Sequence, residues 1–105
     1  MELRGEKLGI LISCPPDSHN FRHGLGLASA AIKSGVDVYL YCIDDAVRGV
    51  EDSELQVLQG QGVKLYACAY GANRRSYPLT DKASFAGLTV VNDLIAGTDR
   101  FVSFN

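Results

Sequence analysis

The sequence predicts a single α/β domain in which helices on both faces cover a mostly parallel β-sheet, making three layers. Two observations lead to this class. Short apolar runs alternate along the chain with segments of helical periodicity, and such alternation implies right-handed crossovers between parallel strands. The 105 residues, of which 47% are hydrophobic, suffice for one modest core and leave little room for a second. We therefore expect one domain over residues 1–105.

The first predicted strand and helix occupy the N-terminal third of the chain. Residues 8–14 form a continuous apolar run, which is typical of a strand buried on both faces. The strand is expected to end there, because two prolines follow the run. Asp17 and Ser18 are candidate caps for a helix that ends at Gly35. Apolar residues at successive spacings of four, three and four mark the side of this helix that we expect to be buried: Phe21, Leu25, Ala28 and Ile32.

Two glycines interrupt this predicted helix. Gly24 and Gly26 lie in its interior, where a glycine costs about 1 kcal/mol relative to alanine. A close backbone contact on the glycine side of the helix would offset that cost. We therefore expect another element to approach this part of the helix closely.

Three further strands complete a predicted sheet of four. Residues 36–43, 63–68 and 100–104 are rich in β-branched, aromatic and other apolar side chains. Between the first two of them, an acidic segment leads into a short helix that begins at Ser53 and is closed by Gly60.

The last predicted helix covers residues 85–96 and precedes the final strand. Gly97 follows its expected end. Between the third strand and this helix, residues 70–78 form an irregular basic stretch, which is the most distinctive segment of the chain. The helix is indicated by apolar residues at helical spacing: Leu88, Val91 and Ile95.

All three cysteines lie at or beside the carboxyl end of a predicted strand. These residues are Cys14, Cys42 and Cys68. In open parallel sheets, sites form beyond this edge, because the loops that leave the strands converge there. An odd number of cysteines without close pairing does not suggest a disulfide framework. We therefore expect three reduced thiols at one edge of the sheet.

Cys68 differs from the other two cysteines in its neighbours. Arg74 and Arg75 follow it within the basic stretch, and a short helix starting near Ala69 would aim backbone N–H groups at the sulfur. Both features favour a thiolate, which is the nucleophile in disulfide exchange and in accepting sulfane sulfur. The alternative is that Cys68 packs at a strand end as a small, inert apolar side chain.

The other two thiols have more ordinary surroundings. Cys14 is either a core residue or a second thiol at the same edge. A redox pair between Cys14 and Cys68 would require their Cα atoms to approach within about 7 Å. Cys42 lies among aromatic and apolar residues and is followed by Asp44 and Asp45, whose charges oppose a thiolate, so we expect it to be structural.

Composition and missing motifs exclude several classes of protein. Ten basic and twelve acidic residues give a net charge of −2, so no broad positive field favours direct binding of nucleic acid. No apolar run approaches the roughly 20 residues of a membrane span, and the N-terminus lacks a signal-peptide pattern, so we expect no membrane association and a cytoplasmic location.

His19 and His23 lack the further ligands that zinc requires, and no dinucleotide or P-loop motif occurs. Neither a metal nor a cofactor is expected.

The segment from Cys68 to Arg75 carries the most specific likeness to known proteins. With three further segments, it makes the chain resemble the DsrE/DsrF-like (YchN/TusD-like) sulfur-relay family over nearly its whole length. The resemblance implies a three-layer α/β subunit of a trimer or hexamer, with a persulfide on Cys68. Family members usually have glycine where this chain has Ala46 and Ser76. The further matching segments are residues 8–13, 45–47 and 87–104.

These observations lead to two hypotheses of different classes. In the first, the protein is a cytoplasmic sulfur carrier, a possible sulfurtransferase: Cys68 accepts sulfane sulfur from a donor protein and passes it to an acceptor protein. Arg74 and Arg75 would stabilise the persulfide anion. In the second, the chain is a non-catalytic structural or regulatory subunit that binds a small anion or a partner at the thiol edge. We expect a homo-oligomer in either case, because several tyrosines offer an aromatic patch: Tyr39, Tyr41, Tyr66, Tyr70 and Tyr77.

Overall fold

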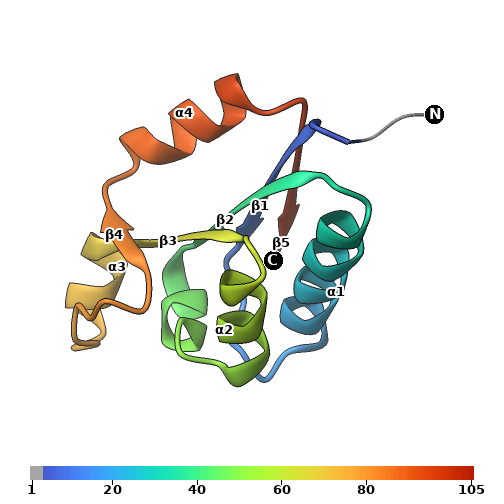
Figure 1. Ribbon diagram of the computed structural model, residues 1–105. Coiled ribbons are helices and arrows are strands. Elements are labelled where there is room, and N and C mark those ends of the chain that lie inside the picture. The colour runs from blue at the N-terminus through green and yellow to red at the C-terminus, as the bar shows by residue number, and fades with distance from the viewer. Residues whose placement is uncertain (1–3) are drawn as a thin grey trace.

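A computed structural model describes residues 4–105 of the chain as one five-stranded sheet with surrounding helices (Figure 1). The sheet order is β4-β3-β2-β1-β5, and every neighbouring pair of strands is parallel. The predicted α/β class is therefore confirmed, with a sheet that is parallel throughout. In chain order the elements are β1 (Lys7–Ile12), α1 (His19–Lys33), β2 (Asp37–Cys42), the 3₁₀ helix η1 (Asp44–Gly49), α2 (Ser53–Gly60), β3 (Lys64–Cys68), α3 (Ala69–Arg74), β4 (Ser84–Ala86), α4 (Thr89–Gly97) and β5 (Arg100–Phe104).

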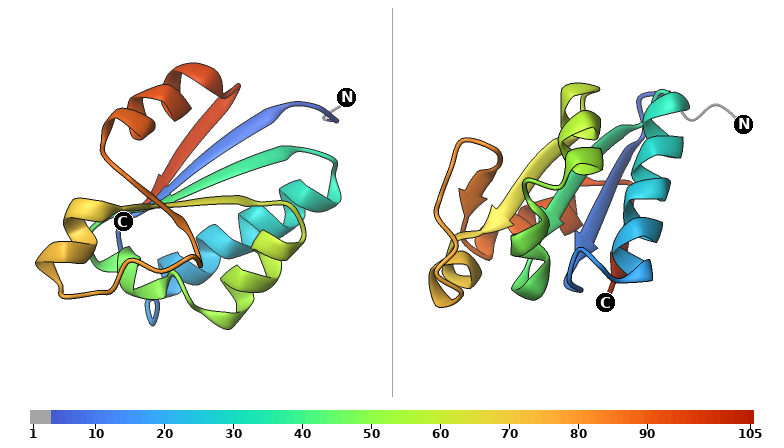
Figure 2. Two further views of the ribbon diagram at one scale, coloured as in Figure 1. Left: turned by 60° about the vertical axis from the view of Figure 1, so that its left-hand side comes forward. Right: turned by 90° about the horizontal axis from the view of Figure 1, so that it is seen from below.

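Helices cover both faces of the sheet, as the sequence predicts. The left view of Figure 2 shows α1 and α2 on one face and α4 on the other. α4 contacts chiefly β1 and β5. Tyr39 and Tyr66, on β2 and β3, are only partly covered on that face. The face beneath α1 and α2 is the more completely packed one, because the side chains that β2 directs there are fully buried: Val38, Leu40 and Cys42.

Two short elements differ from the sequence-based expectation. β4 is a fifth strand, in a segment where the last helix was expected to begin, and η1 was not assigned from the sequence. A strand of three residues shows no hydrophobic period of its own, and β4 forms because β3 supplies its hydrogen-bond partners. The six-residue α3 begins at Ala69, where the sequence predicts the start of a short helix, and it covers the first part of the basic stretch 70–78.

The buried side of α4 also differs from the expectation. Leu94 is buried, with Val91 packed partly against the core. Leu88 and Ile95, expected to face the sheet, are 57% and 52% exposed. Because β4 pairs with β3, the helix starts only at Thr89, and its path across the sheet turns a different stripe inward.

The packing of α1 explains one of its two interior glycines. A Cβ atom at Gly24 would lie 2.8 Å from Cδ1 of Ile12 and 3.3 Å from Cδ2 of Phe104, whereas one at Gly26 would meet no atom within 4 Å. The close contact expected from the sequence is therefore present at Gly24 and absent at Gly26. Ser18 caps the helix, since its side chain accepts a hydrogen bond from the backbone N–H of Phe21 at 3.2 Å.

Alanine substitutions at these two positions should have opposite effects on stability. Gly26→Ala should raise the free energy of unfolding by about 0.5–1 kcal/mol, because alanine is the better helix former and the site is open. Gly24→Ala should be at least about 1 kcal/mol less stable than Gly26→Ala, because the added methyl group displaces packed core atoms. Urea denaturation followed by circular dichroism measures both. Equal stability of the two variants would contradict the packing described for Gly24.

Candidate functional site

The carboxyl ends of the central strands converge at one end of the sheet (Figure 2). Cys42 ends β2, Cys68 ends β3, and Cys14 follows two residues after β1. All three are free thiols, as the sequence predicts. Their surroundings differ enough to give them different chemistry.

Cys68 joins β3 to α3. It is the last residue of β3 and also the N-cap of α3, and its Sγ accepts a hydrogen bond from the backbone N–H of Gly71 at 3.3 Å. A helix that starts at Ala69 and directs an N–H group at the sulfur is therefore present, as expected. The side chain is only 3% exposed, so its access to solvent is narrow.

Tyr41 is a neighbour of Cys68 that the sequence did not reveal. It lies opposite Tyr66 in the register of β2 and β3, so Cys68, two residues after Tyr66, lies on the same face of the sheet. The Tyr41 hydroxyl donates to the carbonyl oxygen of Ala86 at 3.1 Å, and Ala86 lies opposite Cys68 in β4. Tyr41 is fully buried, which corrects its expected place in an exposed aromatic patch.

Arg74 and Arg75 make hydrogen bonds to groups other than the sulfur. Nε of Arg75 donates to Oδ1 of Asp45 at 3.0 Å, and Nη1 donates to the carbonyl oxygen of Gly71 at 3.3 Å. Nη1 of Arg74 lies 3.4 Å from the hydroxyl of Tyr70, whose ring centre is 5.9 Å from the guanidinium carbon. Asp45 thus orients Arg75 and competes for its charge.

These side chains surround a pocket of about 480 Å³ at the carboxyl edge of the sheet. It combines one thiol, two guanidinium groups and the carboxylate of Asp44, and its exposed apolar rim includes Leu88. Such a pocket can admit a small anion or the sulfur-bearing end of a side chain, and hold it beside the thiol. The residues that line it are Ile43, Asp44, Cys68, Tyr70, Gly71, Arg74, Arg75 and Leu88.

The other two cysteines lie outside this pocket. Cys42 is fully buried, and burial, with Cys14 adding to the effect, raises the pKa of its thiol to about 12. It therefore stays protonated near neutral pH, and burial rather than the neighbouring carboxylates is the main cause. Cys14 is 8% exposed, and its thiol donates to the carbonyl oxygen of Phe104, with 3.8 Å between the sulfur and that oxygen.

The sheet order argues against a disulfide between Cys14 and Cys68. β2 lies between β1 and β3, and adjacent strands are about 4.8 Å apart. Two such spacings exceed the Cα separation of about 7 Å beyond which a disulfide needs backbone movement. Cys14 also contacts Phe104 of β5, on the side of β1 that faces away from β2.

Two positions near the pocket have a left-handed backbone. Ser76 has a φ of 55° and Asp44 a φ of 53°. Glycine is the residue that adopts this region most readily. The backbone at Ser76 therefore has a conformation that suits the glycine usually found there in the family that the sequence resembles. Ala46, the other such position, lies in η1 and is not among the residues with positive φ between positions 4 and 105.

His19 and His23, the pair weighed above as metal ligands, lie exposed at the start of α1. Nowhere in residues 4–105 do three or more His, Cys, Asp or Glu side chains gather in a way that could hold a metal ion. Over the same residues, each helix is too short or too polar to cross a bilayer.

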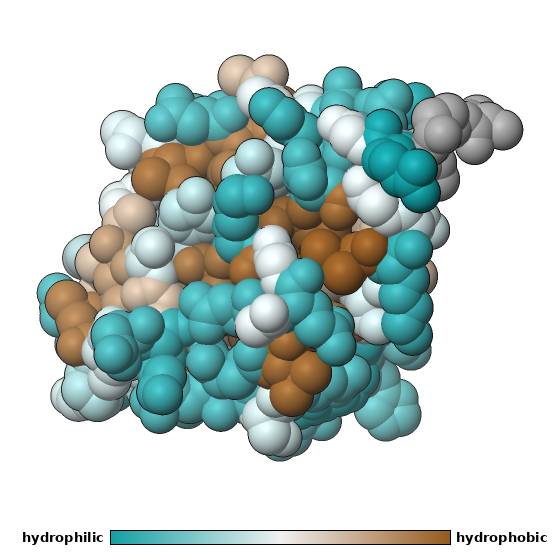
Figure 3. All heavy atoms as spheres, viewed as in Figure 1, coloured by the Kyte–Doolittle hydropathy of each residue, from teal (hydrophilic) through white to brown (hydrophobic). Residues whose placement is uncertain are grey.

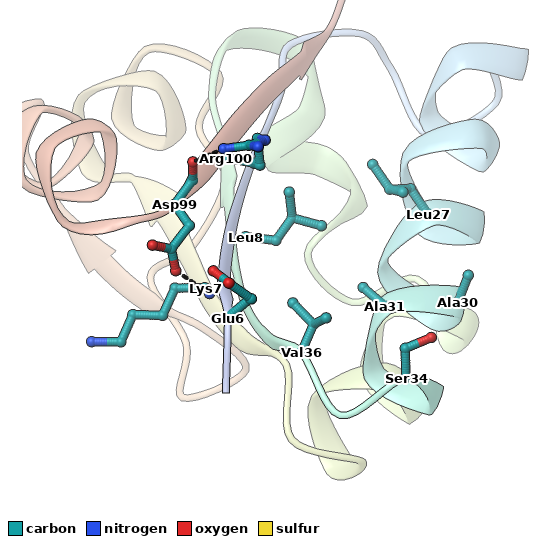
Figure 4. A pocket seen from close by; sticks show the side chains of 10 residues that line it. All are labelled: Glu6, Lys7, Leu8, Leu27, Ala30, Ala31, Ser34, Val36, Asp99 and Arg100. Carbon is teal, nitrogen blue, oxygen red and sulfur yellow. Dashed lines mark hydrogen bonds between the residues drawn. The ribbon is translucent and has the colours of Figure 1, made fainter. Parts of the chain in front are cut away.

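A second, larger groove of about 590 Å³ lies at the opposite, amino end of the strands, between α1 and the strands β1 and β5 (Figure 4). Its floor is apolar, and Figure 3 shows apolar surface between α1 and the sheet. On its rim, Oδ2 of Asp99 accepts a hydrogen bond from the backbone N–H of Lys7 at 2.7 Å. The groove holds no thiol. It is lined by Glu6, Lys7, Leu8, Leu27, Ala30, Ala31, Ser34, Val36, Asp99 and Arg100.

Fold and site together define a small parallel α/β protein with a cysteine in a pocket at the carboxyl end of its third strand. The model of the DsrE/DsrF-like family matches residues 6–104, and the chain belongs to this family. The family is generally associated with sulfur relay. The likeness noted in the sequence is therefore confirmed.

Solved structures share this fold across almost the entire chain. The YchN protein of E. coli superposes with a TM-score of 0.78 at 20% identity, over 95% of this chain and 99% of that one. BT1422 of Bacteroides thetaiotaomicron, a conserved protein of unknown function, gives 0.77 at 14% identity, over 94% and 95%. A comparison with curated protein sequences found no match.

Charge in the pocket should be measurable with two alkylating reagents of different charge. The ratio of the Cys68 alkylation rates with iodoacetate and with iodoacetamide should fall about two- to five-fold in Arg75→Gln, because one nearby positive charge is lost. Asp45→Asn should raise the ratio, because it releases Arg75 from its ion pair. Arg48→Gln is the matched control, since Arg48 is exposed and outside the pocket. An identical ratio in all four proteins would show that Arg75 does not act on the thiol.

Proposed function

We propose that this protein is a small cytoplasmic sulfur carrier, a sulfurtransferase in the broad sense, that holds sulfane sulfur as a persulfide on Cys68. The observation that carries the proposal is the place of Cys68: a thiol at the carboxyl edge of a parallel sheet, in a pocket lined by two arginines. Sulfane sulfur transfer needs a thiolate nucleophile and a site that tolerates an anion. Family membership adds independent support.

The transfer proceeds in two displacement steps. The Cys68 thiolate attacks the outer sulfur of a donor persulfide, a new S–S bond forms, the S–S bond of the donor breaks, and the donor leaves as a thiolate. The proton of the donor persulfide travels with the transferred sulfur. It is released to water while the persulfide is held as an anion in the pocket, and it returns before the second step. In the second step, a thiolate of the acceptor protein attacks that outer sulfur, and Cys68 leaves as a thiolate. No net oxidation or reduction occurs, so no cofactor is required.

Within this mechanism, the pocket stabilises charge on the transferred sulfur. Cys68, Arg74 and Arg75 line the same cavity, so a second sulfur atom on Cys68 that extends into it enters the field of two guanidinium groups. Arg75 turns from Asp45 toward this anion, and Arg74 turns from Tyr70. Charge-assisted hydrogen bonds of this kind are stronger than neutral ones.

One observation favours a second candidate function. The Cys68 sulfur is nearly enclosed and already accepts a hydrogen bond as a helix cap, while Arg75 is paired with Asp45. These contacts also suit an inert subunit that binds a small anion or a partner at the pocket without sulfur chemistry. The two functions differ in whether Cys68 takes up sulfur.

Intact-protein mass spectrometry distinguishes the two functions. After incubation with a persulfide donor, the wild-type protein should gain the mass of one sulfur atom, and peptide mapping should place it on Cys68. Cys68→Ser should gain none, because a hydroxyl cannot form a persulfide. Cys14→Ser is the control and should label like wild type. Labelling of Cys68→Ser to the wild-type extent would refute the carrier function.

Self-association is part of the proposed function, as a homo-oligomer of three or six subunits. Apolar side chains on α4 and around the pocket support it, because Leu88 and Ile95 are more than half exposed, and large exposed apolar residues mark interaction surfaces. Tyr70 adds an exposed aromatic ring beside the pocket.

The assembly should be visible in solution. Light scattering at micromolar concentration should give a mass several times that of one chain, and Ile95→Lys should lower it, because a charge would then be buried in the interface. Lys82→Glu, on an exposed loop, controls for the change in net charge. A wild-type protein that stays at the mass of a single 11.3 kDa chain would contradict this expectation.

A further inference from the structure

The hydroxyl of Tyr41 is a buried polar group beside Cys68 that the mechanism above leaves unused. It donates to the carbonyl oxygen of Ala86 at 3.1 Å, and the carbonyl oxygen of Gly87 lies 3.4 Å away. A hydroxyl carries a single proton, and the longer of the two contacts is weak. When a stronger acceptor forms nearby, the proton can turn to it and give up the hydrogen bond to Ala86.

Strand pairing places the Cys68 sulfur within reach of this hydroxyl. Tyr41 lies opposite Tyr66, and Cys68 is the next residue of β3 on the same face, a diagonal position that aromatic side chains can span. Ala86, whose carbonyl group accepts the hydrogen bond, lies opposite Cys68. The hydroxyl is thus held over the boundary between β3 and β4, at the position of Cys68.

The surroundings of Tyr41 make it a donor rather than a base. Burial raises the pKa of the Tyr41 hydroxyl well above its ordinary value, and the Cys68 sulfur adds to this effect. The hydroxyl therefore keeps its proton near neutral pH. Tyr41 does not line the pocket that holds Arg74 and Arg75, so it approaches Cys68 from the core side.

We propose that Tyr41 donates a hydrogen bond to Sγ of Cys68 whenever that sulfur carries a negative charge. This inference rests on the proposed sulfur-carrier function, in which Sγ is the attacking thiolate of the first step and the leaving thiolate of the second. The Tyr41 proton stays on its oxygen throughout, and no bond to Tyr41 forms or breaks. A donor held in the core loses little by reorganising and acts on a charge in a poorly screened environment.

The other ionisable groups near Cys68 act from different directions. Those on α3 and η1 lie on the pocket side, where water screens them, and Cys42 faces the opposite side of the sheet. Tyr41 is therefore the hydroxyl whose removal should be felt most directly at Sγ. The other groups are Tyr70 and Arg74 on α3, Arg75 at its C-cap, Asp44 and Asp45 on η1, and Cys42 on β2.

The test is the pH dependence of Cys68 alkylation by iodoacetamide, measured in a Cys14→Ser background. In Tyr41→Phe, the midpoint of the rate profile should move up by about one pH unit, and the rate at pH 7 should fall about tenfold, because one hydrogen bond to the thiolate is lost. Tyr66→Phe is the matched control: its ring lies opposite Tyr41 on the same sheet face, and its hydroxyl makes no hydrogen bond within residues 4–105. Its midpoint should equal that of the parent protein.

A second variant keeps the inference testable if Tyr41→Phe fails to fold. Replacing Tyr41 by a ring-fluorinated tyrosine strengthens the donor while keeping the shape, and should move the midpoint down. The inference would be overturned if the fluorinated variant kept the midpoint of the parent protein and if Tyr41→Phe, where it folds, kept that midpoint as well. Sulfur uptake in the mass spectrometry experiment is an independent result. If uptake occurs with no midpoint shift, only the role of Tyr41 fails; if the midpoint shifts without uptake, the carrier function fails.

Discussion

The parallel register of β2, β3 and β4 is the constraint on which the site depends. It sets Tyr41 opposite Tyr66 and Cys68 opposite Ala86, and so brings a thiol, a hydroxyl and a backbone carbonyl group to one point of the sheet. A slip of one residue in β3 would carry Cys68 to the face covered by α1 and α2. Although β4 has only three residues, the site depends on it, because it supplies the carbonyl group of Ala86 that orients Tyr41.

Around this point, the protein separates two environments on either side of one sulfur atom. On the core side, Sγ is close to a buried tyrosine hydroxyl and apolar packing. On the pocket side, it is near two arginines that are themselves occupied by Asp45 and Tyr70. The resting pocket is therefore less positive than its arginine content suggests, because Asp45 pairs with Arg75 and Asp44 lines the same pocket.

The two faces of the sheet are packed unequally. α1 and α2 seal one face, while a single helix of nine residues crosses the other. That helix leaves Ile95 and Leu88 exposed and Tyr39 and Tyr66 only partly covered. A chain of 105 residues has too few helical segments to cover both faces fully. The uncovered apolar surface lies close to the thiol pocket through Leu88, so a partner that covered this surface would lie beside the entrance to Cys68.

The sequence by itself determined the α/β class, the four longer strands, the approximate bounds of α1 and α2, and Cys68 with its two arginines as the candidate site. Hydrophobic period, turn residues and spacing are local properties, which is why these features could be predicted. The sequence alone could not predict the strand β4, the side of α4 that faces the core, or the role of Tyr41. These depend on which strands become neighbours and in what register. Tyr41 and Cys68 stand 27 positions apart in the chain, and only the pairing of β2 with β3 makes them neighbours. The tertiary structure also decided that Asp45 holds Arg75, because η1 and α3 meet only after the sheet has formed.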